Sequence, residues 1–268
     1  MVKAGAAGHL ADAGPDAHTQ GPMDQGSGVA SSSLPQSPVP LSQVETWIFD
    51  LDNTLYPASC NLFAQIDHRM SAYIQARFGA SPEDAHTRQK ALFREHGTTL
   101  RGLMLEHDVD PTEFLEFVHD IDLSPVPRSA LLGEALLKLP GRKLIYTNGS
   151  TRHAENVLHH MGIRPHFAEI FDIVEAGYIP KPDPRPYEEM IRRHGVDPNR
   201  AAMVEDIARN LVPAAALGMT TVWVKSRSEW AQPDADGTGG VADLPPHIHH
   251  AVEDLTPWLA DLAGLPTG

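Results

Sequence analysis

Two aspartates, Asp50 and Asp52, follow a short apolar run and have the clearest potential for chemistry in this chain. Trp47, Ile48 and Phe49 predict a buried strand, and residues two apart in a strand point to the same side, so both carboxylates are expected to converge beyond its end. Two acids in one pocket repel each other unless a cation or a proton intervenes, and oxygen ligands suit Mg2+. The alternative is a merely polar exit from the strand.

A second polar group lies between an apolar run and a predicted helix. Thr147, Asn148 and Gly149 follow the apolar residues 144–146. A hydroxyl, an amide and a glycine that permits close backbone approach can bind a phosphate at a helix N-terminus. A plain turn with Ser150 as the helix N-cap explains the same residues.

A lysine and two acids complete the set of candidates. Lys181 lies in a segment rich in prolines, which restrict the backbone and would present its ammonium rigidly, although surface lysines are common. Glu205 and Asp206 follow the apolar run 201–204. Asn210 lies one helical turn beyond Asp206, on the same face if a helix begins there.

Composition limits the classes of function. The formal charge of -14 argues against a binder of nucleic-acid polymers or anionic membranes, because the protein would repel polyanions. A small phosphate ester remains compatible, since one lysine and a metal can reverse the local charge. A single cysteine, Cys60, excludes an internal disulfide and fits a reducing compartment. With no signal peptide and no apolar run of about 18 residues, we expect a cytoplasmic protein.

The chain divides into regions of different pattern. Residues 1–42 are polar, without apolar periodicity, and predict a disordered tail in which Met23 is a possible second start. Residues 58–127 show helical spacing and no alternating strand, as in a helical insert. From Ser129 short apolar strands alternate with helices, which predicts a parallel sheet covered on both faces. Residues 226–246 read as a loop.

The predicted strands bring the polar groups to one place. The strands expected after the first are 143–146, a weak one at 171–174, 201–204 and 220–224, and residues 251–262 read as strand and helix. In open parallel sheets, ligands bind beyond the carboxyl ends of the strands. Asp50 and Asp52, Thr147 and Asn148, Lys181, and Glu205 and Asp206 would all meet there.

In this order the motifs closely resemble those of the haloacid dehalogenase-like hydrolase superfamily: Asp-Leu-Asp-Asn-Thr, Thr-Asn-Gly, Lys-Pro and Glu-Asp-x-x-x-Asn. The resemblance covers about residues 46–262. Within the superfamily, the segments 50–57 and 247–255 look most like the pyrimidine 5'-nucleotidase group. The resemblance implies an α/β, Rossmann-like three-layer parallel sheet core at 43–57 and 128–268, and an all-helical cap at 58–127.

The resemblance also implies roles for individual residues. Asp50 would attack phosphorus and become a transient aspartyl-phosphate. Asp52 would protonate the leaving alkoxide and then take a proton from water. Thr147 and the backbone of Asn148 and Gly149 would hold the phosphoryl oxygens, and Lys181 would balance their charge.

Mg2+ is the cofactor that the resemblance implies. It would be held by Asp50, the backbone carbonyl of Asp52 and Asp206, with Glu205 acting through water. Asn210 stands where relatives often have an acid, and its implied part is to orient Lys181. By contrast, we do not expect a metal at the C-terminal histidines His247, His249 and His250. Strand geometry would send His249 and His250 to opposite faces, and no carboxylate is placed to complete a site.

The expected activity is Mg-dependent hydrolysis of a phosphomonoester, with UMP or CMP as the substrate type and a monomer or homodimer as the assembly. The alternative is a phosphatase of sugar phosphates, phosphoglycolate or another small ester. A dehalogenase needs neither a proton donor nor a divalent cation, so the presence of Asp52 argues against it. A non-enzymatic binding protein would be favoured by loss of Asp50 or Asp52, and both are present.

Overall fold

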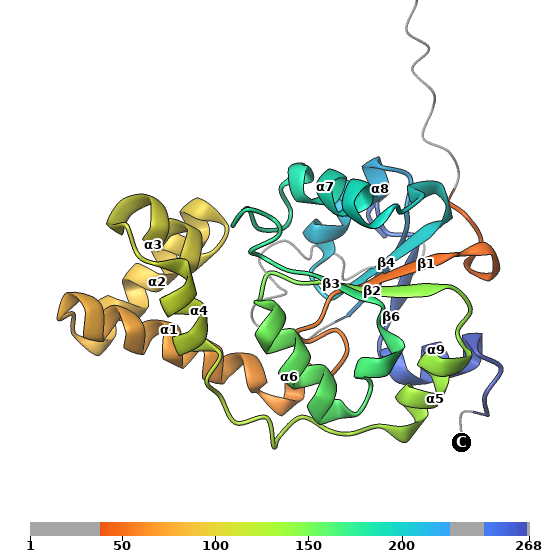
Figure 1. Cartoon of the computed structure of the whole chain (residues 1–268), viewed down its shortest axis with the longest axis horizontal. Coiled ribbons are helices and arrows are strands. Elements are labelled where there is room, and N and C mark those ends of the chain that lie inside the picture. The colour runs from red at the N-terminus through yellow and green to blue at the C-terminus, as the bar shows by residue number, and fades with distance from the viewer. Residues whose placement is uncertain (1–37, 226–243, 267–268) are drawn as a thin grey trace, which may run out of the picture. The chain divides into compact units, whose positions relative to one another are not determined.

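The computed structural model describes residues 38–225 and 244–266. Its centre is a 6-stranded sheet with the order β3-β2-β1-β4-β5-β6, and each neighbouring pair is parallel (Figure 1). The strands are β1 (Thr46–Phe49), β2 (Arg142–Tyr146), β3 (Glu169–Phe171), β4 (Ala201–Glu205), β5 (Thr220–Val224) and β6 (His250–Val252). The predicted α/β class with a Rossmann-like parallel sheet is confirmed.

Strand β1 lies in the middle of the sheet and sets the position of the first acid. Phe49 pairs with Ile145 of β2 on one side and with Val204 of β4 on the other. The next residue, Asp50, donates its backbone N–H to the carbonyl of Val204 at 2.9 Å. Asp50 therefore stands beyond the sheet at the level of Glu205, the last residue of β4.

Helices cover both faces of the sheet (Figure 1). They are α5 (Ala130–Lys138), α6 (Thr151–Met161), α7 (Pro184–His194), α8 (Leu211–Ala216) and α9 (Leu255–Leu262). Side chains alternate across β1, so Trp47 and Phe49 join a core cluster with α5, α6 and α9, whereas Ile48 joins one with α7 and α8. Burial on both faces explains why the central strands are continuous apolar runs.

Between β1 and β2 the chain forms a helical segment with its own apolar cluster. Its helices are α1 (Leu62–Phe78), α2 (Pro82–His96), α3 (Thr99–His107) and α4 (Pro111–Val118). Ser81 and Asp110 cap α2 and α4, and each is followed by a proline at the first helical position. The cluster buries Ile66, Ile74 and Phe114 among others, so this segment is packed and not a loose excursion.

Short 3-10 helices complete the described structure: Leu41–Gln43, Ala58–Cys60, Arg164–His166, Pro198–Arg200 and Ala208–Asn210. Most of the tail predicted at 1–42 lies outside the described residues, but Val39 packs against the core and its carbonyl accepts a hydrogen bond from Thr220. Most of the loop predicted at 226–246 lies outside them too.

Two predicted elements differ from the structure. The strand expected at 171–174 is found at Glu169–Phe171, because Asp172 turns its carboxylate back to accept the backbone N–H groups of Thr151 and Val174. No helix begins at Asp206, the condition for Asn210 to share a face with it, because α8 begins at Leu211 after a 3-10 turn. Asn210 consequently does not lie on a helical face shared with Asp206.

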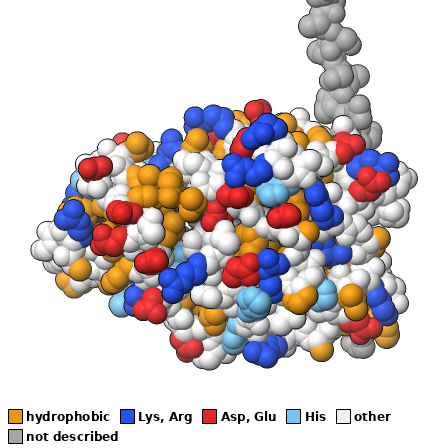
Figure 2. Space-filling model, in the orientation of Figure 1, with side chains coloured by type: hydrophobic (Ala, Val, Ile, Leu, Met, Phe, Trp, Pro, Cys, Tyr) orange, Lys and Arg blue, Asp and Glu red, His pale blue; other side chains and the backbone are white. Residues whose placement is uncertain are grey.

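Within the described residues, no helix is both long and apolar enough to span a membrane. Acidic and basic side chains are interspersed on the face shown in Figure 2.

Gly141 offers a test of the turn that leads into β2. Its φ is +90°, and a Cβ there would lie 2.6 Å from the carbonyl oxygen of Glu45, so we expect Gly141→Ala to destabilise the fold by about 1–3 kcal/mol. Gly133→Ala is the matched control, because its Cβ would meet nothing closer than 3.9 Å inside α5 and should stabilise by about 0.5–1 kcal/mol. Denaturant unfolding measures both, and equal stability of the two variants would contradict the assignment of strain.

Candidate active site

The turn after β1 holds both acids of the first motif. Asn53 has a φ of 62°, which reverses the chain tightly, and Leu55 N–H bonds back to the carbonyl of Leu51 at 3.1 Å. The hydroxyl of Thr54 donates to Asp50 Oδ2 at 2.9 Å, so the turn itself orients this carboxylate. Asp50 is buried, with 6% of its surface exposed.

Lys181 meets Asp50 from a distant part of the chain. Its Nζ lies 2.7 Å from Asp50 Oδ1 and 2.6 Å from Glu205 Oε2, and it donates to the carbonyl of Tyr146 at 3.0 Å. The backbone N–H of Lys181 donates to Asn148 Oδ1 at 2.9 Å, which anchors the proline-rich connector to the loop after β2. The structure therefore brings Asp50, Lys181, Asn148 and Glu205 together, as the sequence predicted.

Burial governs the charges in this group. Loss of solvation and the Glu205 carboxylate raise the pKa of Asp50 to about 7, although Lys181 acts against this shift. Burial, Glu205 and Asp50 likewise raise the pKa of Asp206 well above its usual value. Burial alone would lower the pKa of Lys181, but Asp50 and Glu205 raise it. These buried carboxylates repel one another, and a bound cation would stabilise their charged forms.

The acids have the donor set of a hard cation. Asp50, Glu205 and Asp206 each offer a carboxylate oxygen, these oxygens lie within 4.8 Å of one another, and all three residues are buried. Oxygen ligands of this kind suit Mg2+. Glu205 is the least available, because its Oε2 contacts Lys181 and its Oε1 accepts hydrogen bonds from Asn210 Nδ2 at 2.9 Å and Ile207 N–H at 3.3 Å.

Asn210 is thus connected to Lys181 through Glu205. The sequence led us to expect that it orients the lysine, and in the structure its amide contacts Glu205, which in turn contacts the lysine. The physical reason is the 3-10 turn at Ala208–Asn210, which directs this side chain back toward the end of β4.

The loop after β2 provides polar groups at the start of α6. Thr147 is 1% exposed, and its Oγ1 accepts the backbone N–H of Gly149 at 2.9 Å. Ser150 is the N-cap of α6 and accepts the N–H of His153, as expected from the sequence. A Cβ on Gly149 would lie 3.3 Å from Thr147 Oγ1 and 3.2 Å from the His153 ring, so a larger residue would crowd this loop.

Sequence reasoning missed the partners of Asp52. Tyr56 donates its hydroxyl proton to Asp52 Oδ1 at 2.5 Å, and His153 Nε2 lies 2.8 Å from the same oxygen. Burial would raise the pKa of Asp52, but His153 and Tyr56 outweigh it and lower this pKa to about 2. Tyr56 could have been noticed because it lies four residues after Asp52 in the same turn. His153 had no such signal.

A cavity of about 150 Å³ opens onto these residues. Asp50, Asp52, Thr147 and Lys181 line one end of it, and the helical segment lines the other. The residues from the helical segment include apolar, polar and charged side chains: Phe63, Ile66, Asp67, Met70, Gln89, Lys90, Phe93, Thr98, Thr99, Leu100, Phe114, Leu115, Val118 and His119. The helical segment thus brings a charged pair of its own to the cavity, since Lys90 Nζ lies 2.8 Å from Asp67 Oδ1.

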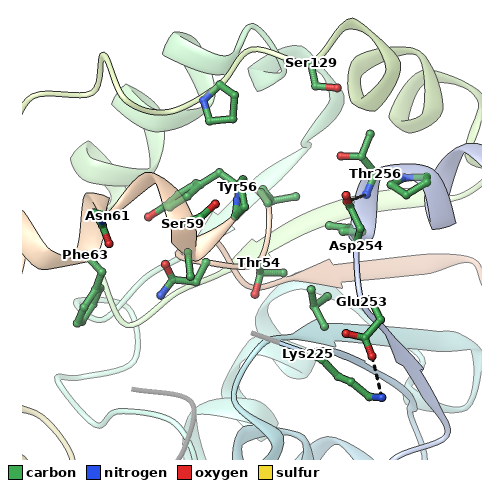
Figure 3. Close-up of a pocket in the computed structure, with 18 of the residues that line it drawn as sticks. Thr54, Tyr56, Ser59, Asn61, Phe63, Ser129, Lys225, Glu253, Asp254 and Thr256 are labelled. Atoms are coloured by element: carbon green, nitrogen blue, oxygen red, sulfur yellow. Dashed lines mark hydrogen bonds and ion pairs between the residues drawn. The ribbon is translucent and has the colours of Figure 1, made fainter. Parts of the chain in front are cut away.

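A second hollow, of about 1210 Å³, lies beside Tyr56 and is shown in Figure 3. Its charged groups are already engaged: Lys225 contacts Glu253 at 2.9 Å, and Asp254 caps α9 through Thr256 N–H at 3.0 Å. Neither Asp50 nor Lys181 lines this hollow. Both line the smaller cavity, which is therefore the candidate active site.

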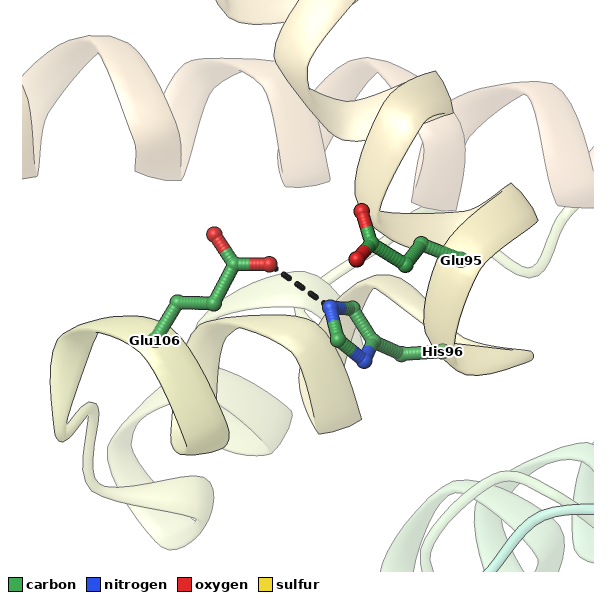
Figure 4. A group of neighbouring side chains, drawn as sticks. All are labelled: Glu95, His96 and Glu106. Carbon is green, nitrogen blue, oxygen red and sulfur yellow. Dashed lines mark hydrogen bonds and ion pairs between the residues drawn. The ribbon is translucent and has the colours of Figure 1, made fainter.

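A further group of possible metal ligands lies on α2 and α3 (Figure 4). Glu95 and Glu106 are exposed there, and His96 Nε2 already contacts Glu106 at 2.6 Å. None of the three lines the cavity at the strand ends. The C-terminal histidines make other contacts: His247 lies 3.1 Å from the carbonyl of Ala208, and His249 Nδ1 accepts the N–H of Thr221.

The sequence is similar to those of known proteins. Phosphate metabolism protein 8 of Saccharomyces cerevisiae is 26% identical over 207 residues, which is 69% of this chain and 63% of the yeast protein. The glyceraldehyde 3-phosphate phosphatase of Methanothermobacter thermautotrophicus is 28% identical over 204 residues, covering 69% of this chain and 88% of that enzyme. This chain thus spans less than two thirds of the yeast protein.

Solved structures agree on the fold. A HAD phosphatase from Thermococcus onnurineus superposes with a TM-score of 0.55 at 19% identity, over 82% of this chain and 98% of that one. The haloacid dehalogenase-like hydrolase family model matches residues 44–218, a range that contains every strand-end residue from Asp50 to Asn210. The chain therefore belongs to the haloacid dehalogenase-like hydrolase family.

Proposed function

We propose that this protein is a Mg-dependent phosphomonoester hydrolase that works through an aspartyl-phosphate on Asp50. The observation that carries the proposal is the contact of the Asp50 carboxylate with Lys181 at 2.7 Å, in a cavity that a second acid, Asp52, also lines. Nucleophile, counter-charge and proton donor are thus within reach of one bound phosphate. The proposal also has support from family membership and from a relative named as a phosphatase.

Asp50 and Asp52 take part in both steps of the reaction, in different roles. A carboxylate oxygen of Asp50 attacks phosphorus and displaces the ester oxygen, which Asp52 protonates as it leaves. Water then attacks the aspartyl-phosphate, and Asp52 takes the proton from that water. Lys181 stays fully charged beside Asp50 and balances the negative charge that phosphate brings into a buried site.

The phosphoryl group would rest on the loop after β2. Thr147 and the backbone of Asn148 and Gly149 lie just before the N-terminus of α6, where the helix dipole favours an anion. Thr147 and Gly149 both line the cavity that contains Asp50. Asn148 also anchors Lys181 through its carbonyl oxygen, so one loop places both groups that contact phosphate.

Asp50, Asp206 and the backbone carbonyl of Asp52 would hold Mg2+. The buried, mutually repelling carboxylates fit such a cation, and Glu205 would contribute through water if at all, since Lys181 and Asn210 occupy its oxygens. When bound, the ion offsets the charge of the acids and of the phosphate. The positions of the side chains are otherwise fixed by the protein contacts described above.

We further propose a pyrimidine nucleoside monophosphate as the substrate, with residues 58–127 acting as the cap that selects it. The cavity is lined by aromatic and aliphatic side chains with polar and charged ones among them, including Asp67, Gln89 and Lys90, which suits a flat heterocycle with polar edges. At about 150 Å³ the cavity is smaller than a whole nucleotide, so the cap would have to move to admit one.

A phosphatase of a small ester such as a sugar phosphate or phosphoglycolate is the second candidate. The name of the Methanothermobacter relative, a glyceraldehyde 3-phosphate phosphatase, favours it. The cap also brings hydrogen-bonding side chains to the cavity, among them Asp67, Gln89 and Lys90, which could bind the hydroxyls of such an ester.

Hydrolysis of p-nitrophenyl phosphate should require Mg2+ or a similar ion, because the acids otherwise repel one another and the substrate. Asp206→Asn should raise the Mg2+ concentration for half-maximal rate by about tenfold or more, since it removes a charged ligand. Glu106→Gln, in the exposed group on α3, is the matched control and should change nothing. Full turnover in excess chelator would refute the metal assignment.

Asp50→Asn should abolish turnover in a folded protein, because an amide cannot serve as the nucleophile. It should also raise the melting temperature of the metal-free protein more at about pH 8 than at about pH 4.5. The folded-state pKa of Asp50, about 7, exceeds its ordinary value of 3.8, so the folded chain holds this proton longer and loses stability as the pH rises through that window. A pH-independent difference would show that the burial of Asp50 is not costly.

UMP or CMP, or their deoxy forms, should exceed AMP and GMP in kcat/KM by at least about tenfold, which is about 1.4 kcal/mol of differential transition-state binding. The reason is that contacts to the base add to catalysis only where the cap fits it. Phosphate release from a panel of nucleotides and sugar phosphates measures this. Equal rates for the nucleotides, or a preference for a sugar phosphate, would contradict the nucleotidase proposal and would still be consistent with a phosphatase.

A further inference from the structure

Hydrogen bonds from the described residues reach one oxygen of the Asp52 carboxylate, Oδ1. Both of its hydrogen bonds within the described residues end on Oδ1, from the Tyr56 hydroxyl at 2.5 Å and from His153 Nε2 at 2.8 Å. An oxygen that already accepts two strong hydrogen bonds is poorly placed to exchange a proton with substrate. The exchanging oxygen is then Oδ2.

His153 is built into the fold as a fixed donor. It lies in the first turn of α6, 1% of its side chain is exposed, and its own backbone N–H bonds to Ser150 Oγ at 3.2 Å. Because a carboxylate oxygen can only accept, Nε2 carries the proton in this contact. An imidazole buried to this degree, with its donor aimed at an acid in the cavity, has no part in the roles proposed above.

A second histidine holds the ring of the first. His119 directly follows α4, and its ring stacks on that of His153 with centroids 4.3 Å apart and an angle of 13°. Its Nδ1 lies 3.0 Å from Ser150 Oγ, the same hydroxyl that caps α6. Burial and the neighbouring His153 lower the pKa of His119 to about 3, so the stacked ring is neutral. The His153 ring is therefore fixed by its helix and by a stacked neighbour.

We propose that His153 is a positioning residue, acting with Tyr56, that fixes the Asp52 carboxylate so that Oδ2 faces the departing ester oxygen. The inference rests on the proposed role of Asp52 as acid and base, and it adds a residue that the motifs do not contain. His119 supports it by holding the His153 ring in place.

The proton balance assigns His153 no change of state. The ester enters as its monoanion and passes its proton to Oδ2 of Asp52. As the bond from phosphorus to the ester oxygen breaks and the bond to Asp50 forms, Oδ2 gives that proton to the leaving oxygen. When water attacks phosphorus and the bond to Asp50 breaks, Oδ2 takes a proton from that water. His153 keeps its Nε2 proton throughout and supplies orientation alone.

The test compares esters whose leaving groups differ in their need for a proton. Benzyl phosphate releases an alkoxide that must be protonated, whereas p-nitrophenyl phosphate releases a stable phenolate that need not be. The value of kcat/KM reports every step up to departure of the leaving group, so it isolates the acid half of the reaction. The variants are Asp52→Asn, His153→Leu, His153→Gln and Tyr56→Phe, with His159→Leu on the exposed side of α6 as the matched control.

We expect His153→Leu to lose kcat/KM on benzyl phosphate by about tenfold or more beyond its loss on p-nitrophenyl phosphate. This loss is smaller than the loss expected on removing the general acid itself, because Asp52 is still present. His153→Gln, which keeps a nitrogen donor at similar reach, should stay within about threefold of the native enzyme on both esters. Tyr56→Phe removes one hydroxyl, should fold normally, and should show the same selectivity as His153→Leu. His159→Leu should match the native enzyme.

Equal losses on both esters in His153→Leu and Tyr56→Phe, or no rescue by His153→Gln, would reduce His153 to a structural residue and overturn the inference. Asp52→Asn separates this failure from that of the proposed function. If Asp52→Asn loses more kcat/KM on benzyl phosphate than on p-nitrophenyl phosphate and His153→Leu does not, Asp52 is the acid but His153 does not position it. If Asp52→Asn shows no selectivity, Asp52 is not the acid, and both fall.

Discussion

The structure depends on the cost of burying several carboxylates in one place. Asp50, Glu205 and Asp206 lie beyond adjacent strands with little exposure, and a single ammonium, Lys181, contacts two of them. Removing carboxylates from water is expensive unless charge and hydrogen bonds compensate. Breaking the lysine contact would leave uncompensated buried charge, so the elements that carry Lys181 must be held as firmly as the strands themselves.

The surrounding contacts satisfy that requirement. The prolines on both sides of Lys181 restrict the connector, Asn148 anchors its backbone, and the carbonyl of Tyr146 accepts a proton of its ammonium. Parallel pairing of β1 with β2 and β4 places the acids at the same edge. Fold and site are therefore one arrangement, because the register that fills the core also brings the charges together.

Much of this could be predicted from the sequence, because polar residues directly after apolar runs mark strand ends. Asp50, Thr147 and Glu205 were found in that way. The partners of Asp52 could not be, since His153 lies 101 residues away and only the folded chain brings the two together. The placement of Asn210 depended on where the next helix begins, and the sequence pattern did not distinguish a 3-10 turn from the start of a helix.

The position of β1 in the sheet has a consequence for how the protein folds. Thr46 is near the beginning of the described chain, yet it pairs with Arg142 on one side and Ala201 on the other. During synthesis, the strand that carries Asp50 leaves the ribosome first and has no strand partner until far more of the chain has emerged. Such long-range pairing slows folding and leaves an apolar strand exposed to other chains. We expect the proposed activity to appear only after β4 has emerged and paired with β1, so phosphate release would report a late stage of folding.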